Sequence, residues 1–337
     1  MADLTLDAPG GPVDPVRDDA PASDDTSRPP TSMPVHGRPR RRGRRSWVPY
    51  LLLAPGLLWL VVFYIAPMVT TASLSMQEGN VDDGYEFTGN VGIFLDALGS
   101  YWPQLVRSLL YAGIATLLAL LLGYPLAYFI ASRRGRMKNI LLVLVIAPFF
   151  TSFLIRTMAW QTFLSSEGGT LTSILNWAHL GFLFDWFGNL LQWVGASPNG
   201  EILYSPFAVV WGLTYNFLPF MILPLYTSLD RLDGRLLEAA GDLYATPRET
   251  FRHVTWPLSL PGVVSGTLLT FIPASGDFIN SRLLGNTNTV MIGQVIDSQF
   301  LRVLDYPLAS ALSFVLLVII LVLVMVYVRR AGTEELV

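Results

Sequence analysis

Residues 306 to 328 read YPLASALSFVLLVIILVLVMVYV and contain no charged side chain. A run of this length is sufficient to cross the hydrocarbon core of a bilayer, which needs about 20 residues of helix. Five further apolar runs with almost no charge precede it along the chain. Together the six runs predict membrane-spanning helices at about residues 48–76, 106–132, 138–165, 202–230, 256–281 and 305–328.

The composition also favours a membrane protein. Of 337 residues, 52% are hydrophobic and 14% are charged, which leaves too little charge to cover a soluble globule of this size. The chain has no cysteine, so disulfides, thiolate metal sites and cysteine nucleophiles are excluded. The predicted fold class is an all-α integral membrane protein with six transmembrane helices.

Basic residues predict the orientation of the spans, because cytoplasmic connections are enriched in Lys and Arg. They gather before the first span, in alternate connections and after the last span, whereas the opposite connections are acidic or neutral. We therefore expect both termini to be cytoplasmic. The basic residues concerned are Arg38, Arg40, Arg41, Arg42, Arg44, Arg45, Arg133, Arg134, Arg136, Lys138, Arg231, Arg235, Arg248, Arg252, Arg329 and Arg330.

The first 45 residues differ from the rest of the chain. They are rich in Pro, Asp, Ser and Arg and carry no apolar run, which is typical of a disordered tail. We interpret the arginine-rich end of this tail as a positive-inside anchor, in preference to a nucleic-acid patch or a signal peptide. The expected organisation is a cytoplasmic tail (1–45), a transmembrane domain (46–330) and a second cytoplasmic tail (331–337).

Residues 168–200 are apolar in patches and hold three tryptophans, so they raise the alternative of a seventh span. That alternative would place the arginine-rich connection after Leu229 outside and reverse the charge pattern beyond it. Tryptophans are common at the membrane interface. We therefore expect short helices at the outer surface.

Catalytic motifs are absent from the sequence. The single lysine, Lys138, follows Arg136 and Met137, so it cannot end a Walker A loop. The three histidines have no HExxH spacing, and no Gly-x-Ser-x-Gly occurs. We therefore expect no enzyme activity, no bound metal and no cofactor on this chain, and any ATP must be hydrolysed by another polypeptide.

The connection at residues 231–255 predicts two short helices. Residues 234–243 contain good helix formers, and Asp233 can cap them. Thr246, Pro247 and Glu249 then fit the N-cap, the first helical position and the third position of a capping box. Two helices at a cytoplasmic surface are suited to docking.

Within this connection, Glu238-Ala239-Ala240 is followed by Val254-Thr255-Trp256-Pro257. The segment resembles the EAA loop of permease subunits of binding-protein-dependent ABC importers. In that family the loop couples the permease to its ATPase. The resemblance implies a type I importer (MetI-like) fold and places the ATPase contact at Glu238, Ala239, Ala240, Gly241, Tyr244 and Pro257.

One position of the motif departs from the family pattern. The family has glycine where this chain has Tyr244, and tyrosine resists the positive φ that glycine permits. We therefore expect the bend to be made differently here, with help from Gly241.

The resemblance extends over about residues 48–330, and within the family it is to the spermidine/putrescine permeases of the PotB type. It is carried by Leu122 to Ala127, by Pro148 to Thr151 with Leu154 to Arg156, and by Leu218 to Met221 with Pro224 to Tyr226. It implies a polyamine substrate, a second permease subunit, two ATPase subunits that hold ATP and Mg²⁺, and an extracytoplasmic binding protein. It implies no nucleic-acid partner and a location in the cell membrane.

Ionisable groups within membrane spans are costly, which makes them functional candidates. Arg156 and Asp277 both fall towards the outer end of the bilayer, and we expect them to be able to form a structural ion pair. An alternative role for Asp277 is to meet a cationic substrate together with Phe278 and Trp160. Two further residues of the fourth span, Tyr215 and Asn216, are polar enough to line the path or to bond neighbouring helices.

Two rival functions remain at the level of sequence. One is the same importer machinery carrying another small solute, and the other, less favoured, is an ATP-independent secondary transporter. A secondary transporter needs intramembrane acids to handle its coupling ions, and apart from Asp230 and Asp305 at the span ends, Asp277 is the one acid within the spans. An importer permease is therefore the favoured hypothesis.

Overall fold

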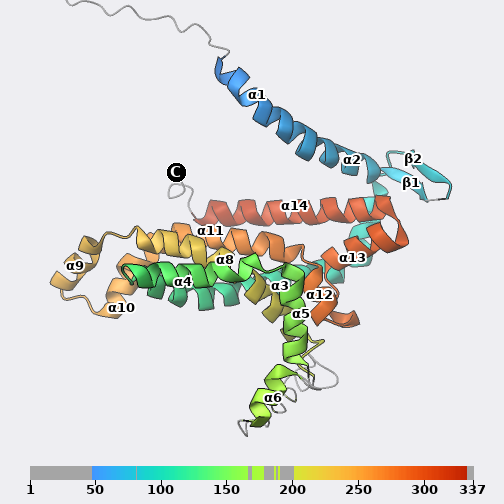
Figure 1. Cartoon of the computed structure of the whole chain (residues 1–337). Coiled ribbons are helices and arrows are strands. Elements are labelled where there is room, and N and C mark those ends of the chain that lie inside the picture. Colours follow the sequence, from blue (N-terminus) through green and yellow to red (C-terminus); the bar gives the residue numbers. More distant parts are fainter. Residues whose placement is uncertain are drawn as a thin grey trace, which may run out of the picture. The chain divides into compact units, whose positions relative to one another are not determined.

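The computed structural model describes residues 48–80, 82–165, 169–177, 186, 189 and 201–331. The chain divides into one unit that ends at Pro55 and another that runs from Gly56 to the C-terminus. The predicted tail at 1–45 and all but the first residue of the predicted tail at 331–337 lie outside the described residues. Figure 1 shows that the described chain is almost entirely helical.

Five helical stretches in the described residues are long and apolar enough to cross a membrane. They agree with five of the six predicted spans. They are formed by α1 (Val48–Leu60) continued through a π-helical turn (Val61–Ile65) into α2 (Ala66–Leu74), by α3 (Gly92–Ala131), by α8 (Pro206–Asp230), by α10 (Pro247–Thr250) continued through a second π-helical turn (Phe251–Thr255) into α11 (Trp256–Ser275), and by α14 (Tyr306–Ala331).

The residues of the third predicted span, 138–165, do not form one continuous helix, as a single straight span would. The span consists of α4 (Arg136–Ile146), a 3₁₀ turn (Ala147–Phe150) and α5 (Phe153–Leu164), and its two parts are bent by 94°. Pro148 lies in the first turn of the 3₁₀ segment, and Thr151 is extended. Because proline removes an N–H and crowds the preceding turn, the helix breaks here.

The second span is longer than the sequence indicated. The helix α3 begins at Gly92 instead of near residue 106, and its 40 residues extend about 60 Å, twice the hydrocarbon thickness. Two short antiparallel strands, β1 (Gln77–Asn80) and β2 (Gly84–Phe87), precede it and were not predicted. In the tryptophan-rich stretch, α6 (Thr170–Trp177) is a short helix as expected, and the rest of that stretch is largely outside the described residues.

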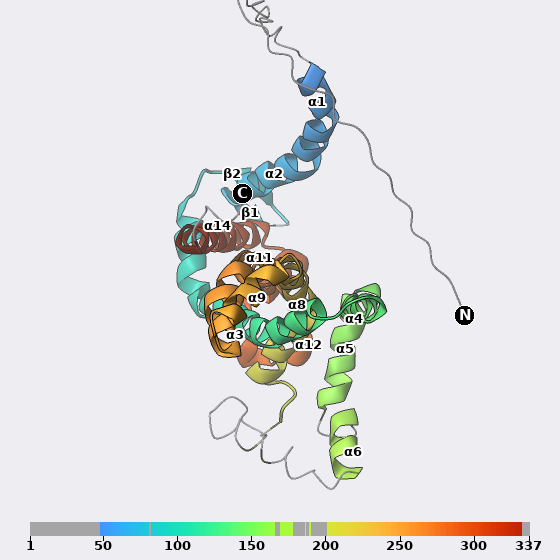
Figure 2. The ribbon, with the colours of Figure 1, turned by 90° about the vertical axis from the view of Figure 1, so that its left-hand side faces the viewer.

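The helices α3, α8 and α11 pack against one another and form the centre of the described bundle (Figure 2). Small residues permit this approach on α11. A Cβ added at Gly262 would lie 2.6 Å from Ser228 Cβ and 2.8 Å from Pro224 O, and one at Gly266 would lie 2.8 Å from Met221 Sδ. The spacing of two glycines four residues apart is a common device for close helix packing in membranes.

The fifth predicted span ends earlier than 281. The helix α11 stops at Ser275, after which α12 (Ile279–Leu284), a 3₁₀ turn (Thr287–Thr289), α13 (Ile292–Ser298) and a π-helical turn (Gln299–Val303) lead to α14. Three apolar side chains of this segment are fully buried, at Leu284, Met291 and Ile292. The segment therefore folds back into the bundle, with α12 against α5 and α8 and α13 against α3 and α14.

Candidate coupling loop and translocation path

The predicted two-helix loop is present between α8 and α11. The helix α9 spans Gly234–Asp242, and the Asp233 side chain caps it by accepting a hydrogen bond from Arg235 N at 3.0 Å. The second helix, α10, begins at Pro247, as expected. It does not stand alone, because it continues through the π-helical turn into α11, with Pro257 in the first turn of α11.

The predicted capping box is also formed. Thr246 Oγ1 accepts from Glu249 N at 3.4 Å, while the Thr246 N–H and hydroxyl donate to Glu249 Oε2 at 2.7 and 2.8 Å. The start of α10 is thus fixed by local chemistry.

The bend between α9 and α10 is made at Tyr244, so the expectation that it would be made differently, with help from Gly241, is wrong. Tyr244 has φ = 60°, whereas Gly241 is an ordinary residue of α9. Tyr244 N donates to Gly241 O at 2.9 Å, and Ala245 N donates to Ala240 O at 3.1 Å. This pattern is a Schellman motif with tyrosine where glycine is usual. The hydrogen bonds of the motif impose the left-handed conformation despite its cost.

Replacing Tyr244 with glycine should stabilise the loop locally. The left-handed conformation costs a residue with a Cβ about 1 kcal/mol or more, and the Tyr244 side chain is 95% exposed, so little packing is lost. We expect Tyr244→Gly to slow hydrogen exchange of the Ala245 amide by about fivefold, because 1 kcal/mol corresponds to that factor. Tyr244→Ala is the control, since it removes the ring and keeps the strain. Equal exchange in both variants would contradict the assigned strain.

The loop presents its motif residues to solvent. Glu238 and Ala239 are exposed, and Ala240 is buried. Leu243 is 82% exposed beside Tyr244. Exposed apolar side chains on a rigid, capped pair of helices are typical of a surface that another protein covers.

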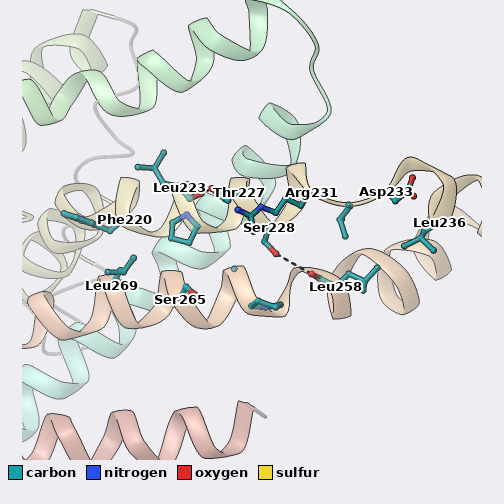
Figure 3. Close-up of a pocket in the computed structure, with 14 residues that line it drawn as sticks. Phe220, Leu223, Thr227, Ser228, Arg231, Asp233, Leu236, Leu258, Ser265 and Leu269 are labelled. Carbon is teal, nitrogen blue, oxygen red and sulfur yellow. Dashed lines mark hydrogen bonds between the residues drawn. The ribbon is translucent and has the colours of Figure 1, made fainter. Parts of the chain in front are cut away.

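A groove of about 790 Å³ lies where the loop joins α8 and α11. Figure 3 shows Phe220, Leu223 and Thr227 of α8 facing Leu258, Ser265 and Leu269 of α11, with Asp233 and Leu236 of the loop at one end. Ser228 Oγ donates to Leu258 O at 3.4 Å across it. Displacement of the loop would therefore alter the space between these two helices.

A second connection links the loop to the bundle through Tyr124 of α3, which lies in the motif Leu122 to Ala127 but was not predicted to have a functional role. Its ring packs at 5.7 Å edge-on against Phe251 of the π-helical turn and at 5.3 Å against Trp256. Its hydroxyl is 2.8 Å from Ser259 Oγ. Ser259 donates its own proton to Trp256 O at 2.9 Å, so Tyr124 is the donor to Ser259.

Removing either hydroxyl should show which of the two residues donates the hydrogen bond. Ser259→Ala leaves the buried Tyr124 hydroxyl without its acceptor and should cost about 1–3 kcal/mol, whereas Tyr124→Phe should cost about 1 kcal/mol. We expect the apparent melting temperature of the purified protein to fall more in Ser259→Ala than in Tyr124→Phe. The double variant should resemble Tyr124→Phe. The reverse order would contradict the assigned donor.

Two of the predicted path residues belong to one buried polar chain. Asn216 of α8 donates through Nδ2 to Thr157 Oγ1 of α5 at 3.1 Å and to Asn280 Oδ1 of α12 at 3.0 Å. Asn280 in turn donates to Asp277 Oδ1 from its backbone at 2.8 Å and from Nδ2 at 3.2 Å. All four residues are at most 8% exposed. Asn280 is the link that sequence reasoning missed, although its position three residues after Asp277 suits an N–H donor to that carboxylate.

The close approach of α12 to α8 depends on Gly212. A Cβ at this position would lie 2.4 Å from Leu284 Cδ1 and 2.7 Å from Asn280 Oδ1. A larger residue would push α12 away from α8. The hydrogen bond between Asn216 and Asn280 therefore depends on the small size of Gly212.

The remaining predicted path residues form separate groups. Trp160 of α5 packs edge-on against Tyr215 of α8 at 5.3 Å. Phe278 instead borders a hollow of about 320 Å³ with Asp297 of α13 and Leu316 of α14. No ring contact in the described residues joins Phe278 to Trp160, and a shared role of these two residues with Asp277 stays a prediction.

Arg156 does not form the expected ion pair with Asp277. The ion pairs among the described residues are Lys138–Asp230 at 2.7 Å and Arg282–Asp297 at 3.1 Å. The Arg156 guanidinium instead lies over the Phe149 and Phe153 rings. Asp277 Oδ1 instead accepts from the backbone and the side chain of Asn280.

Comparison with known proteins identifies the class. Residues 119–331 match the family described as "Binding-protein-dependent transport system inner membrane component", and the chain belongs to this family. It is 37% identical over 277 residues to the spermidine/putrescine transport system permease protein PotB of Escherichia coli (strain K12), which covers 81% of this chain and 94% of that protein. It is 30% identical over 298 residues to the inner membrane ABC transporter permease protein YdcU of the same organism, covering 85% and 90%.

The fold also resembles a solved structure. A crystal structure of a bacterial ABC transporter involved in the import of the acidic polysaccharide alginate matches with a TM-score of 0.64 and 18% identity, over 85% of this chain and 96% of that chain. This likeness concerns the fold. It confirms the predicted permease architecture, and the family match confirms a membrane permease class for the chain.

Proposed function

We propose that this chain is one of two permease subunits of an ATP-driven importer for polyamines such as spermidine and putrescine. The observation that carries the proposal is the rigid, capped loop between α8 and α11, which presents Glu238 and Ala239 to solvent in a chain 37% identical to PotB over most of its length. This chain supplies the membrane path and performs no catalysis.

The proposed importer contains further subunits. Two ATPase subunits bind the loop on the cytoplasmic side and hold ATP and Mg²⁺, and an extracytoplasmic binding protein delivers the solute. Both termini of this chain lie in the cytoplasm, as the alternation of basic connections favours. Closure of the ATPases moves the loop, and the contacts of Tyr124 and of the groove carry this movement to α3, α8 and α11.

The polar chain supports a path for a cationic amine. It holds a carboxylate at Asp277 and a buried acceptor, Asn216 Oδ1, that receives no hydrogen bond from any described residue. Ammonium groups carry donors only, so both groups suit them. The neighbouring Trp160 and Tyr215 rings add faces that attract cations.

A direct test is uptake into vesicles that contain this chain, its second permease and its ATPase, with the binding protein added outside. We expect ATP-dependent uptake of labelled spermidine or putrescine. Transport of a different solute with failure of every polyamine would assign the machinery to that solute. Uptake that persists without the ATPase would instead indicate a secondary transporter.

A further inference from the structure

Arg156 is a buried cation with unused hydrogen-bond donors. It is 8% exposed, and neither its Nε nor its Nη1 donates to a described residue. Neither described ion pair includes it. A guanidinium removed from water without a counter-charge is strongly unfavourable, so the described residues alone leave this site incomplete.

The surroundings hold the guanidinium at the bend between α4 and α5. Its Cζ lies 5.3 Å from the ring centre of Phe149 and 5.7 Å from that of Phe153, one on each side of the bend. These rings pack in turn against Phe220 and Phe217 of α8, at 5.0 and 6.0 Å. Side chains of a helix lean towards its N-terminus, so the guanidinium faces the first turn of α5.

The start of α5 adds positive potential at the same place. Its N-cap residue, Ser152, makes no side-chain capping bond. The unpaired N–H groups and the dipole of this 12-residue helix favour a negative charge there. Two independent features, a buried guanidinium and an uncapped helix start, therefore require an anion.

The depth of the bend indicates the source of that anion. The ion pair of Lys138 with Asp230 is partly exposed and marks the polar boundary of α4. From Lys138 to Phe150 the chain rises about 20 Å into a hydrocarbon core about 30 Å thick. Because of the 94° bend, α5 then runs along the plane of the membrane instead of spanning it. Arg156 therefore stays near that depth. Lipid phosphates lie outside the hydrocarbon core, so a protein must supply the charge.

The surface around the site is suited to another protein. Figure 2 shows α5 leading away from the α3–α8–α11 bundle. Its outward residues are apolar and exposed, with Ile155 at 59% and Met158 at 45%, and Phe150 of the bend is 89% exposed. We propose that a carboxylate of the second permease subunit packs against this face and pairs with Arg156. This inference rests on the proposed function, which supplies that subunit.

The test is co-purification of the second permease with tagged versions of this chain, expressed together with the ATPase. We expect Arg156→Gln to lower the recovered second permease at least fivefold per tagged chain, and Arg156→Lys to restore part of it. The matched control is Arg282→Gln, which breaks an ion pair internal to this chain and should leave recovery unchanged. Equal recovery with Arg156→Gln and wild type would overturn the proposal.

A charge exchange separates pairing from misfolding. Arg156→Glu should be rescued by changing one intramembrane Asp or Glu of the second permease to Arg, and failure of every such exchange would overturn the proposal. The same loss of recovery in Glu167→Gln or Asp185→Asn of this chain would assign the counter-charge to this chain and also overturn it. A wild-type chain that recovers neither permease nor ATPase would instead refute the proposed function.

Discussion

Reversing the charge at Glu238 should release the ATPase. We expect Glu238→Lys to weaken ATPase binding at least tenfold, about 1.4 kcal/mol, and to lower ATP-dependent uptake by a similar factor. The side chain is exposed and makes no hydrogen bond or ion pair with a described residue, so the fold of α9 should persist. The loss comes from presenting an ammonium group to a partner surface that accommodates a carboxylate. Co-purification of the ATPase and uptake into vesicles measure the two effects.

A matched control uses the same chemical change elsewhere. Glu86 lies exposed on β2, far from the loop in sequence, and Glu86→Lys alters the net charge equally. It should leave ATPase recovery unchanged. Equal ATPase recovery from Glu238→Lys and wild type would remove the docking role from α9.

Removing the Asn280 side chain should destabilise the bundle by about 3–5 kcal/mol. Asn280→Ala deletes a hydrogen bond to the Asp277 carboxylate and another from Asn216, and it leaves a cavity at a fully buried site. We expect a large fall in the apparent melting temperature of the purified protein and uptake reduced at least tenfold. The reason is that α12 would lose its polar attachment to α8.

Two further variants test whether the loss of stability comes from the buried hydrogen bonds of Asn280. Asn288→Ala removes the same atoms at an exposed position and should change stability by less than about 0.5 kcal/mol. Adding Asp277→Ala to Asn280→Ala should cost less than the sum of the single changes, because it removes the carboxylate that lost its side-chain donor. Strictly additive effects would show that the two residues act independently.

Local chemistry made the loop predictable. Capping by Asp233 and the reciprocal bonds of Thr246 and Glu249 involve residues at most three positions apart, so they can be read from the sequence. The conformation of Tyr244 was not predictable in the same way. Its propensity argues against a positive φ, and the Schellman hydrogen bonds outweigh that preference.

Long-range packing decided the candidate path. Asn216 and Asn280 are 64 residues apart, and Asn216 and Thr157 are 59 apart, so no local pattern indicates that they touch. The same limit explains the failed Arg156–Asp277 pair. Opposite charges at similar depth suggested it, but the 94° bend and the donor groups of Asn280 gave the two side chains different surroundings.

The sequence by itself therefore determined five of the spans and the two-helix form of the candidate coupling loop, because apolar length and helix capping are properties of short segments. Only the tertiary structure decided the break in the third span, the return of α12 into the bundle and the polar chain that joins three helices. These three features depend on which helix surfaces pack against each other. Small residues such as Gly212 and Gly262 allow close packing only where the surface of the neighbouring helix fits them.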